Sequence, residues 1–171
     1  MSAPRARGTP TEPPMHTATV PLDYPVIPAA PRALVLGHGV ARVGRLGARA
    51  GYLELTAFAH GAAARHAVAG ALRRIADAPA IILDLRRHRG GESTMASFIT
   101  SCFFATEPLA RERFAPCPGA PAARADAALP RIPASSLDIL VSRETSAIAR
   151  AFAENLRRLG RARVVGPAAE G

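Results

Sequence analysis

Lysine is absent from this sequence of 171 residues, so all 22 basic residues are arginine. The absence excludes any mechanism that uses a lysine side chain as the general base. Cysteine is scarce, because only Cys102 and Cys117 occur and neither has a second cysteine at metal-ligand spacing. We therefore expect no structural zinc site, no other metal and no cofactor. Cys102 lies on the apolar face of an expected helix, which favours a small buried hydrophobic residue.

Long apolar runs are also absent. No segment approaches the length that a membrane-spanning helix needs, and the N-terminal region with Arg5 and Arg7 lacks the apolar core of a secretory signal. We therefore expect a cytoplasmic protein without membrane contacts. The first 32 residues hold eight prolines and no apolar periodicity, which predicts a disordered tail over 1–32. The length and the 49% hydrophobic content predict one folded domain over 33–171.

The net charge of +9 raises the question of nucleic-acid binding. Its arginine pairs fall on different expected elements and do not alternate with aromatic residues: Arg73–Arg74, Arg86–Arg87 and Arg157–Arg158. Arginine without lysine, together with abundant alanine, is typical of GC-rich coding rather than of a binding face. We therefore do not expect nucleic-acid binding. An anion-binding function that uses the glycine turn with Arg86, Arg87 and Arg89 is one further hypothesis.

Hydrophobic periodicity predicts alternating strands and helices, in the order β-α-β-α-loop-β-α-β. This order is typical of a layered α/β domain with right-handed crossovers. Six prolines over 107–136 predict a long loop rather than a helix or a central strand. The expected strands cover 51–58, 80–83, 137–141 and 163–166, and the expected helices cover 60–77, 94–106 and 145–160.

The segment AIILDLRRHRGG, residues 80–91, is the most informative of the chain. Its first four residues form an unbroken apolar run, which predicts a central strand covered on both faces. Gly90 and Gly91 then allow a tight turn with free N–H groups before the next helix. Such a turn suits a carbonyl oxygen that gains negative charge, or equally a phosphate, and it is also found in ordinary strand–helix connections.

Three segments carry a resemblance to a known family. They are GYL at Gly51, DLR at Asp84 followed by Gly90-Gly91, and ILVSRET at 139–145 with FAENLRRLGRARVVG at 152–166. Together these resemble the tail-specific, or C-terminal-processing, serine proteases, in the branch of interphotoreceptor retinoid-binding protein and the tricorn core. The resemblance implies a crotonase-like or ClpP-like α/β fold that we expect to be incomplete at its C-terminus. It also implies a polypeptide substrate and peptide hydrolysis through an acyl-enzyme.

The resemblance assigns the nucleophile to the start of the last helix and an oxyanion hole to Gly90 and Gly91. Ala147 occupies the family's nucleophile position, and Ser146 lies one residue earlier. One residue turns a helical side chain by about 100°. Ser146 is therefore the candidate nucleophile only if the helix start is rebuilt, and both Ser146 and Thr145 are otherwise expected to cap the helix.

The expected site also needs a general base. Because the family's lysine dyad has no counterpart here, a histidine remains, and His60 after the first matched strand is the candidate, although a solvent-facing role is the usual one at a helix entry. His88 stands where the family has asparagine and either lines the site or lies on the surface, and Arg150 stands where the family often has a carboxylate. These departures predict weak or lost activity. The alternative is a non-catalytic module that binds a peptide or an apolar ligand.

Overall fold

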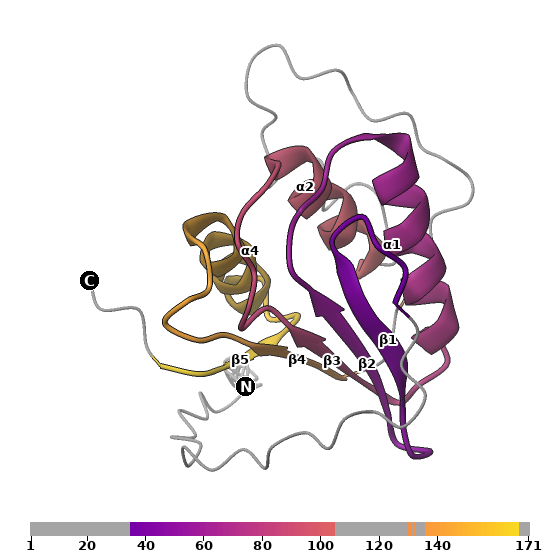
Figure 1. The fold of residues 1–171 in the computed structure, drawn as a ribbon. Coiled ribbons are helices and arrows are strands. Elements are labelled where there is room, and N and C mark those ends of the chain that lie inside the picture. The colour runs from indigo at the N-terminus through magenta and orange to yellow at the C-terminus, as the bar shows by residue number, and fades with distance from the viewer. Residues whose placement is uncertain (1–34, 105–129, 131, 133–135, 168–171) are drawn as a thin grey trace, which may run out of the picture.

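A five-stranded sheet forms the centre of the computed structural model, which describes residues 35–104, 130, 132 and 136–167 (Figure 1). The strands follow one another across the sheet in chain order, β1 to β5. β1 pairs antiparallel with β2, and the remaining pairs are parallel. β3 is the central strand, which confirms the prediction from its apolar run. The strands are β1 (Val40–Leu46), β2 (Ala50–Leu55), β3 (Ala80–Asp84), β4 (Ser136–Leu140) and β5 (Arg163–Val165).

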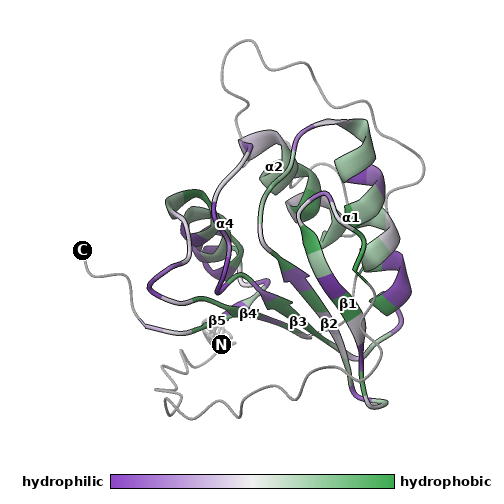
Figure 2. Cartoon of the chain, in the orientation of Figure 1, coloured by the Kyte–Doolittle hydropathy of each residue, from purple (hydrophilic) through white to green (hydrophobic). Residues whose placement is uncertain are grey.

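The helices of the described residues pack on one face of this sheet: α1 (Gly61–Ile75), α2 (Ser93–Cys102) and α4 (Ala147–Arg158) (Figure 1). Their apolar sides and one face of the strands form a single hydrophobic core, the green interior of Figure 2. The face predicted for α1 is buried as expected, at Ala64, Val68, Ala71, Leu72 and Ile75. The mixed α/β class is thereby confirmed, and the predicted strands and helices follow β1 in the predicted order.

Gly51 explains how closely α1 approaches the sheet. A Cβ at this position would lie 2.5 Å from Cβ of Ile75, so the strand needs a residue without a side chain there. The parallel pairing of β2 with β3 then places the ends of both strands, at Glu54 and Asp84, at the same edge of the sheet. That edge carries the loops described below.

The second face of the sheet carries polar pairs. The hydroxyl of Tyr52 donates to Oδ2 of Asp84 at 2.7 Å, and Arg86 contributes three further side-chain bonds to the same carboxylate. Burial alone raises the pKa of Asp84, but the hydrogen bonds from Arg86 and Tyr52 outweigh it and lower the pKa. Glu54, also buried, pairs with Arg87.

One strand was not predicted. β1 runs from Val40 to Leu46 in a segment rich in glycine and arginine, where only Val40 and Val43 are buried. Buried and exposed residues do not alternate strictly along this strand, because its register with β2 shifts between Val40 and Arg42. The strand is therefore defined by its pairing with β2 rather than by its own pattern.

Several predictions concern residues outside the described ranges. The tail over 1–32, most of the loop over 107–136 and Cys117 belong to this group. Cys102 is fully buried, and burial raises the pKa of its thiol to about 12. The thiol is therefore uncharged at pH 7, which agrees with the role of a small hydrophobic residue. Within the described ranges no helix is both long enough and apolar enough to cross a bilayer.

Candidate active site

Two loops meet at the carboxyl edge of the parallel strands. One follows β3 over 85–92, and the other follows β4 over 141–146. The backbone N–H of Leu85 donates to the carbonyl of Leu140 at 2.9 Å, and the hydroxyl of Thr145 donates to the carbonyl of Leu85 at 2.9 Å. Open α/β sheets commonly bind ligands at this edge. The sheet therefore brings together segments that lie nearly 60 residues apart in the chain.

Ser146 and His88 contact each other through both main chain and side chain. The backbone N–H of Ser146 donates to the carbonyl of His88 at 2.9 Å. Oγ of Ser146 lies 2.8 Å from Nδ1 of His88. Ser146 occupies the capping position of α4, but its hydroxyl makes no capping bond. The hydroxyl is instead committed to the histidine ring.

His88 is buried in an aromatic setting. Its exposed fraction is 0%, and its ring lies 4.2 Å from that of Phe58, centroid to centroid. The N–H of Gly90 donates to Nδ1 at 3.2 Å, so Nδ1 is the acceptor and the proton of the neutral ring belongs on Nε2. Nε2 is buried and has no partner in the described part of the chain. Burial lowers the pKa of His88 from its ordinary 6.5 to about 4, so the ring is neutral at pH 7.

The glycine turn has the left-handed backbone that its residues were expected to allow, with φ of 128° at Gly90 and 129° at Gly91. Gly91 presses against Phe58, whose carbonyl oxygen would lie 2.1 Å from a Cβ at that position. The Gly90 N–H is committed to His88. The Gly91 N–H has no hydrogen bond within the described ranges, and Gly91 is exposed. Of the two N–H groups, only that of Gly91 therefore lacks a partner among the described residues.

His60 occupies a different place. Its side chain is 81% exposed at the start of α1, and its Nδ1 lies 2.7 Å from Oε1 of Glu92. Hydrogen bonds from His60 and Thr94 lower the pKa of Glu92. The structure thus pairs His60 with Glu92 and pairs Ser146 with His88. For His88 the sequence left two places open, the lining of the site and the surface. The position of His88, two residues before the glycine turn, was the one sequence signal for it.

Ala147 is the exposed first residue of α4 and has no group that could act as a nucleophile. Arg150, in the first turn of the same helix, reaches back to the preceding loop. Its Nε donates to the carbonyl of Thr145 at 2.9 Å, and its Nη2 donates to the carbonyl of Ser142 at 2.6 Å.

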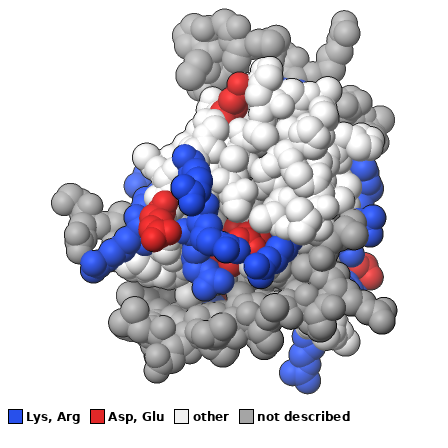
Figure 3. Space-filling model, viewed as in Figure 1, with Lys and Arg blue, Asp and Glu red and all other residues white. Residues whose placement is uncertain are grey.

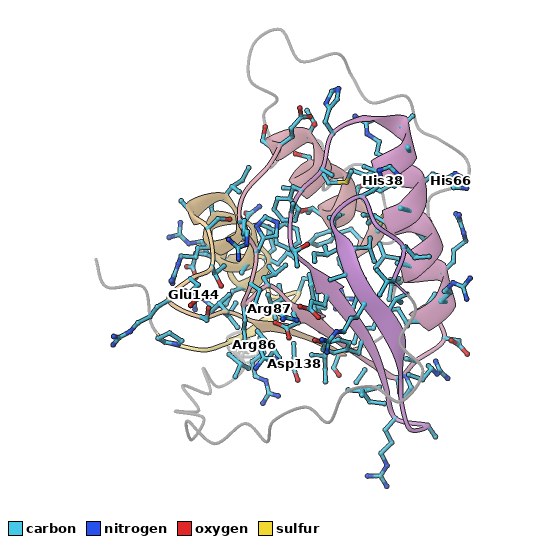
Figure 4. All side chains as sticks on the ribbon, in the orientation of Figure 1. His38, His66, Arg86, Arg87, Asp138 and Glu144 are labelled. Carbon is cyan, nitrogen blue, oxygen red and sulfur yellow. The ribbon has the colours of Figure 1, made fainter. Side chains whose placement is uncertain are left out.

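Two of the arginines considered for anion binding are paired. Arg86 binds Asp84, and Arg87 binds Glu54. Figure 4 labels both at the end of β3, and Figure 3 shows basic side chains beside acidic ones on this face. The pairing weakens the hypothesis of an anion site, because two of its three cations already hold carboxylates. Among the described residues no group of His, Cys, Asp and Glu could hold a metal ion.

Comparison with known proteins adds a family. The sequence model of the family Peptidase S41 matches residues 49–171 of this chain. Among solved structures, a photosystem II D1 C-terminal processing protease is similar at 18% sequence identity and a TM-score of 0.45, over 70% of this chain and 31% of that one. The present chain thus spans less than a third of the length of that protein. The search of curated proteins found no match to the present chain.

Proposed function

The chain belongs to peptidase family S41, as its resemblance to the tail-specific proteases predicted, and we propose that it carries a serine-type peptidase site with Ser146 as nucleophile and His88 as general base. The proposal replaces His60 by His88, because His60 is held by Glu92 while His88 contacts the serine. The substrate in this proposal is a polypeptide.

The contact of 2.8 Å between Oγ of Ser146 and Nδ1 of His88 carries the proposal. A neutral imidazole with its lone pair on Nδ1 can accept the serine proton. Oγ then attacks the peptide carbonyl, and the proton moves from His88 to the departing amine. Water, deprotonated by His88, then attacks the acyl carbonyl. The bond to Oγ breaks as His88 returns the proton to Ser146, which releases the carboxylic acid and restores the enzyme.

The Gly91 N–H supplies the oxyanion donor in this proposal. It is exposed, has no hydrogen bond within the described ranges, and belongs to the residue next to Gly90, whose N–H binds His88. The Gly90 N–H has the supporting role of keeping the lone pair of Nδ1 as an acceptor. A donor of this kind is typically worth 2.7 to 4 kcal/mol in acyl transfer, on the order of a hundredfold or more in rate.

We expect the reaction to be slow. The proton transfer creates an imidazolium in a buried position, and no carboxylate meets Nε2 in the described part of the chain. A pKa lowered from 6.5 to about 4 makes that cation roughly 3 kcal/mol less favourable than in water. In a serine triad the third residue offsets such a cost, and none of the described residues brings a charged group to Nε2 of His88.

The test is covalent labelling by a fluorophosphonate, followed by intact mass. We expect one slow adduct on the folded chain, its loss in Ser146→Ala, and a large decrease in His88→Gln. Ser97→Ala is the matched control, because Ser97 is an exposed serine on α2 outside the two loops. An adduct that survives in Ser146→Ala, or labelling at the same rate in His88→Gln, would contradict the proposal.

A second candidate function, a non-catalytic module that binds a peptide, is favoured by one observation. The residue at the family's nucleophile position is Ala147, which is exposed and chemically inert. Folded protein that gives no adduct, and that binds an unmodified peptide equally well with serine or alanine at 146, would favour this candidate over the peptidase.

A further inference from the structure

We propose that Arg150 is a positioning residue that holds the loop over 142–146 in place and so keeps Oγ of Ser146 against Nδ1 of His88. The inference rests on the proposed function, because it concerns the same serine. It assigns Arg150 no contact with substrate.

The location of Arg150 is electrostatically unfavourable by itself. It lies in the first turn of α4, where the helix dipole disfavours a cation and where the structure has no acidic residue. Its guanidinium reaches back to the residues before the helix and binds the carbonyls of Thr145 and Ser142, at 2.9 and 2.6 Å. A planar group with several donors can hold two carbonyls at once, which an ammonium on a flexible stem does less well. The two bonds explain why an arginine stands there.

The peptide bond between Thr145 and Ser146 is held at both ends. Its carbonyl oxygen accepts from Nε of Arg150 at 2.9 Å, and its N–H donates to the carbonyl of His88 at 2.9 Å. A peptide unit is planar, so fixing both groups fixes the orientation of the whole unit. The Cα of Ser146 is part of that unit. Arg150 and His88 together therefore set the direction from which the serine side chain leaves the backbone.

The other bonds of the loop act at a greater distance from Ser146. The hydroxyl of Ser142 donates to the carbonyl of Arg86 at 2.6 Å, and the hydroxyl of Thr145 donates to that of Leu85 at 2.9 Å. These bonds tie the loop to the segment after β3 but do not involve the carbonyl of Thr145. Arg150 restrains that carbonyl. Without it, only the bond from the Ser146 N–H to the His88 carbonyl restrains this peptide unit directly.

The experiment compares Arg150→Met with Arg158→Met. Methionine keeps an unbranched apolar stem and helix propensity, and Arg158 is an exposed arginine in the last turn of the same helix. We expect Arg150→Met to slow fluorophosphonate labelling of Ser146 roughly tenfold to a hundredfold, because small displacements of a reacting group have effects of that size. Arg158→Met should label at the rate of the unsubstituted chain, and Arg150→Lys should fall between them.

A second measurement separates positioning from a loss of stability. The ¹⁵N chemical shift of Nδ1 of His88 reports its hydrogen bonds, and it is recorded well below the melting temperature of each variant. We expect Arg150→Met to move this shift toward the value found in Ser146→Ala, while Arg158→Met leaves it unchanged. A shift in Arg150→Met equal to that of the unsubstituted chain would overturn the inference.

The two measurements also distinguish this inference from the proposed function. If the unsubstituted chain is never labelled, the peptidase proposal fails, but the chemical shift still shows whether Arg150 controls the contact between Ser146 and His88. If labelling occurs and Arg150→Met is labelled at an undiminished rate, the peptidase proposal stands and the role of Arg150 is refuted.

Discussion

Alanine at Gly90 and alanine at Gly91 should affect stability very differently, although the two glycines are neighbours with nearly the same backbone. Their φ angles are 128° and 129°, so an added side chain is strained to a similar extent in both. A Cβ at Gly90 meets nothing within 4 Å. A Cβ at Gly91 would lie 2.1, 2.6 and 2.8 Å from the O, C and N atoms of Phe58. The pair therefore separates backbone strain from steric conflict.

The magnitudes follow from these contacts. Backbone strain at a left-handed position costs on the order of 1–3 kcal/mol, and this is the whole expected effect of Gly90→Ala. At Gly91 the added Cβ conflicts with backbone atoms, so the segments that contain Phe58 and Gly91 must move apart. Separation breaks the bonds from Phe58 N–H to the Gly90 carbonyl and from Glu92 N–H to the Phe58 carbonyl, at 2.9 and 2.8 Å. Each is worth about 1 kcal/mol. Gly91→Ala should therefore cost roughly 2 kcal/mol more than Gly90→Ala.

Urea denaturation followed by circular dichroism measures this difference, with the free energy of unfolding obtained by linear extrapolation. The dependence of that free energy on urea should be the same for both variants, so that only the midpoint differs. Equal destabilisation by the two substitutions, or a larger loss for Gly90→Ala, would refute the argument that the Phe58 backbone lies against Gly91.

Three further predictions concern His88 and Arg161. Because burial lowers the pKa of His88 to about 4, the unfolded chain binds a proton first as the pH falls from about 6.5, and this contribution to stability is lost between pH 6.5 and 4. His88→Gln should lack that loss, which amounts to up to roughly 3 kcal/mol. Urea denaturation at pH 7 and at pH 4.5 gives the free energy of unfolding of both proteins, and an equal decrease between the two pH values in both would contradict the assignment. The labelling rate of Ser146 should be half-maximal near pH 4 rather than near 6.5, and a profile with its midpoint near 6.5 would count against a buried base. Arg161→Met removes hydrogen bonds to the carbonyls of Phe103 and Ile132, at 2.8 and 2.9 Å, and should lower the free energy of unfolding by about 1–3 kcal/mol. The exposed control Arg157→Met should lower it by less than about 1 kcal/mol. Similar melting temperatures for the two variants would refute this prediction.

The sequence by itself determined the layered α/β class, the central place of β3, the buried face of α1 and the glycine turn. These features are encoded locally: an apolar run of strand length, a helical repeat of apolar residues, and paired glycines that accept a left-handed backbone. The family resemblance was likewise readable, because its three segments occur in order along the chain, and the match over 49–171 agrees with it.

Only the tertiary structure decided which histidine meets Ser146. His60 and His88 both follow predicted strands, and the glycine turn after His88 does not by itself show which of them meets the serine. Burial beneath Phe58 and a sheet that joins residues 58 positions apart place His88 at the serine hydroxyl, while His60 remains at the surface with Glu92. β1 was missed for a related reason, because its glycines and arginines show little alternation and its strand exists through pairing with β2. Burial and pairing arise from contacts distant in sequence, which the periodicity of a single segment does not contain.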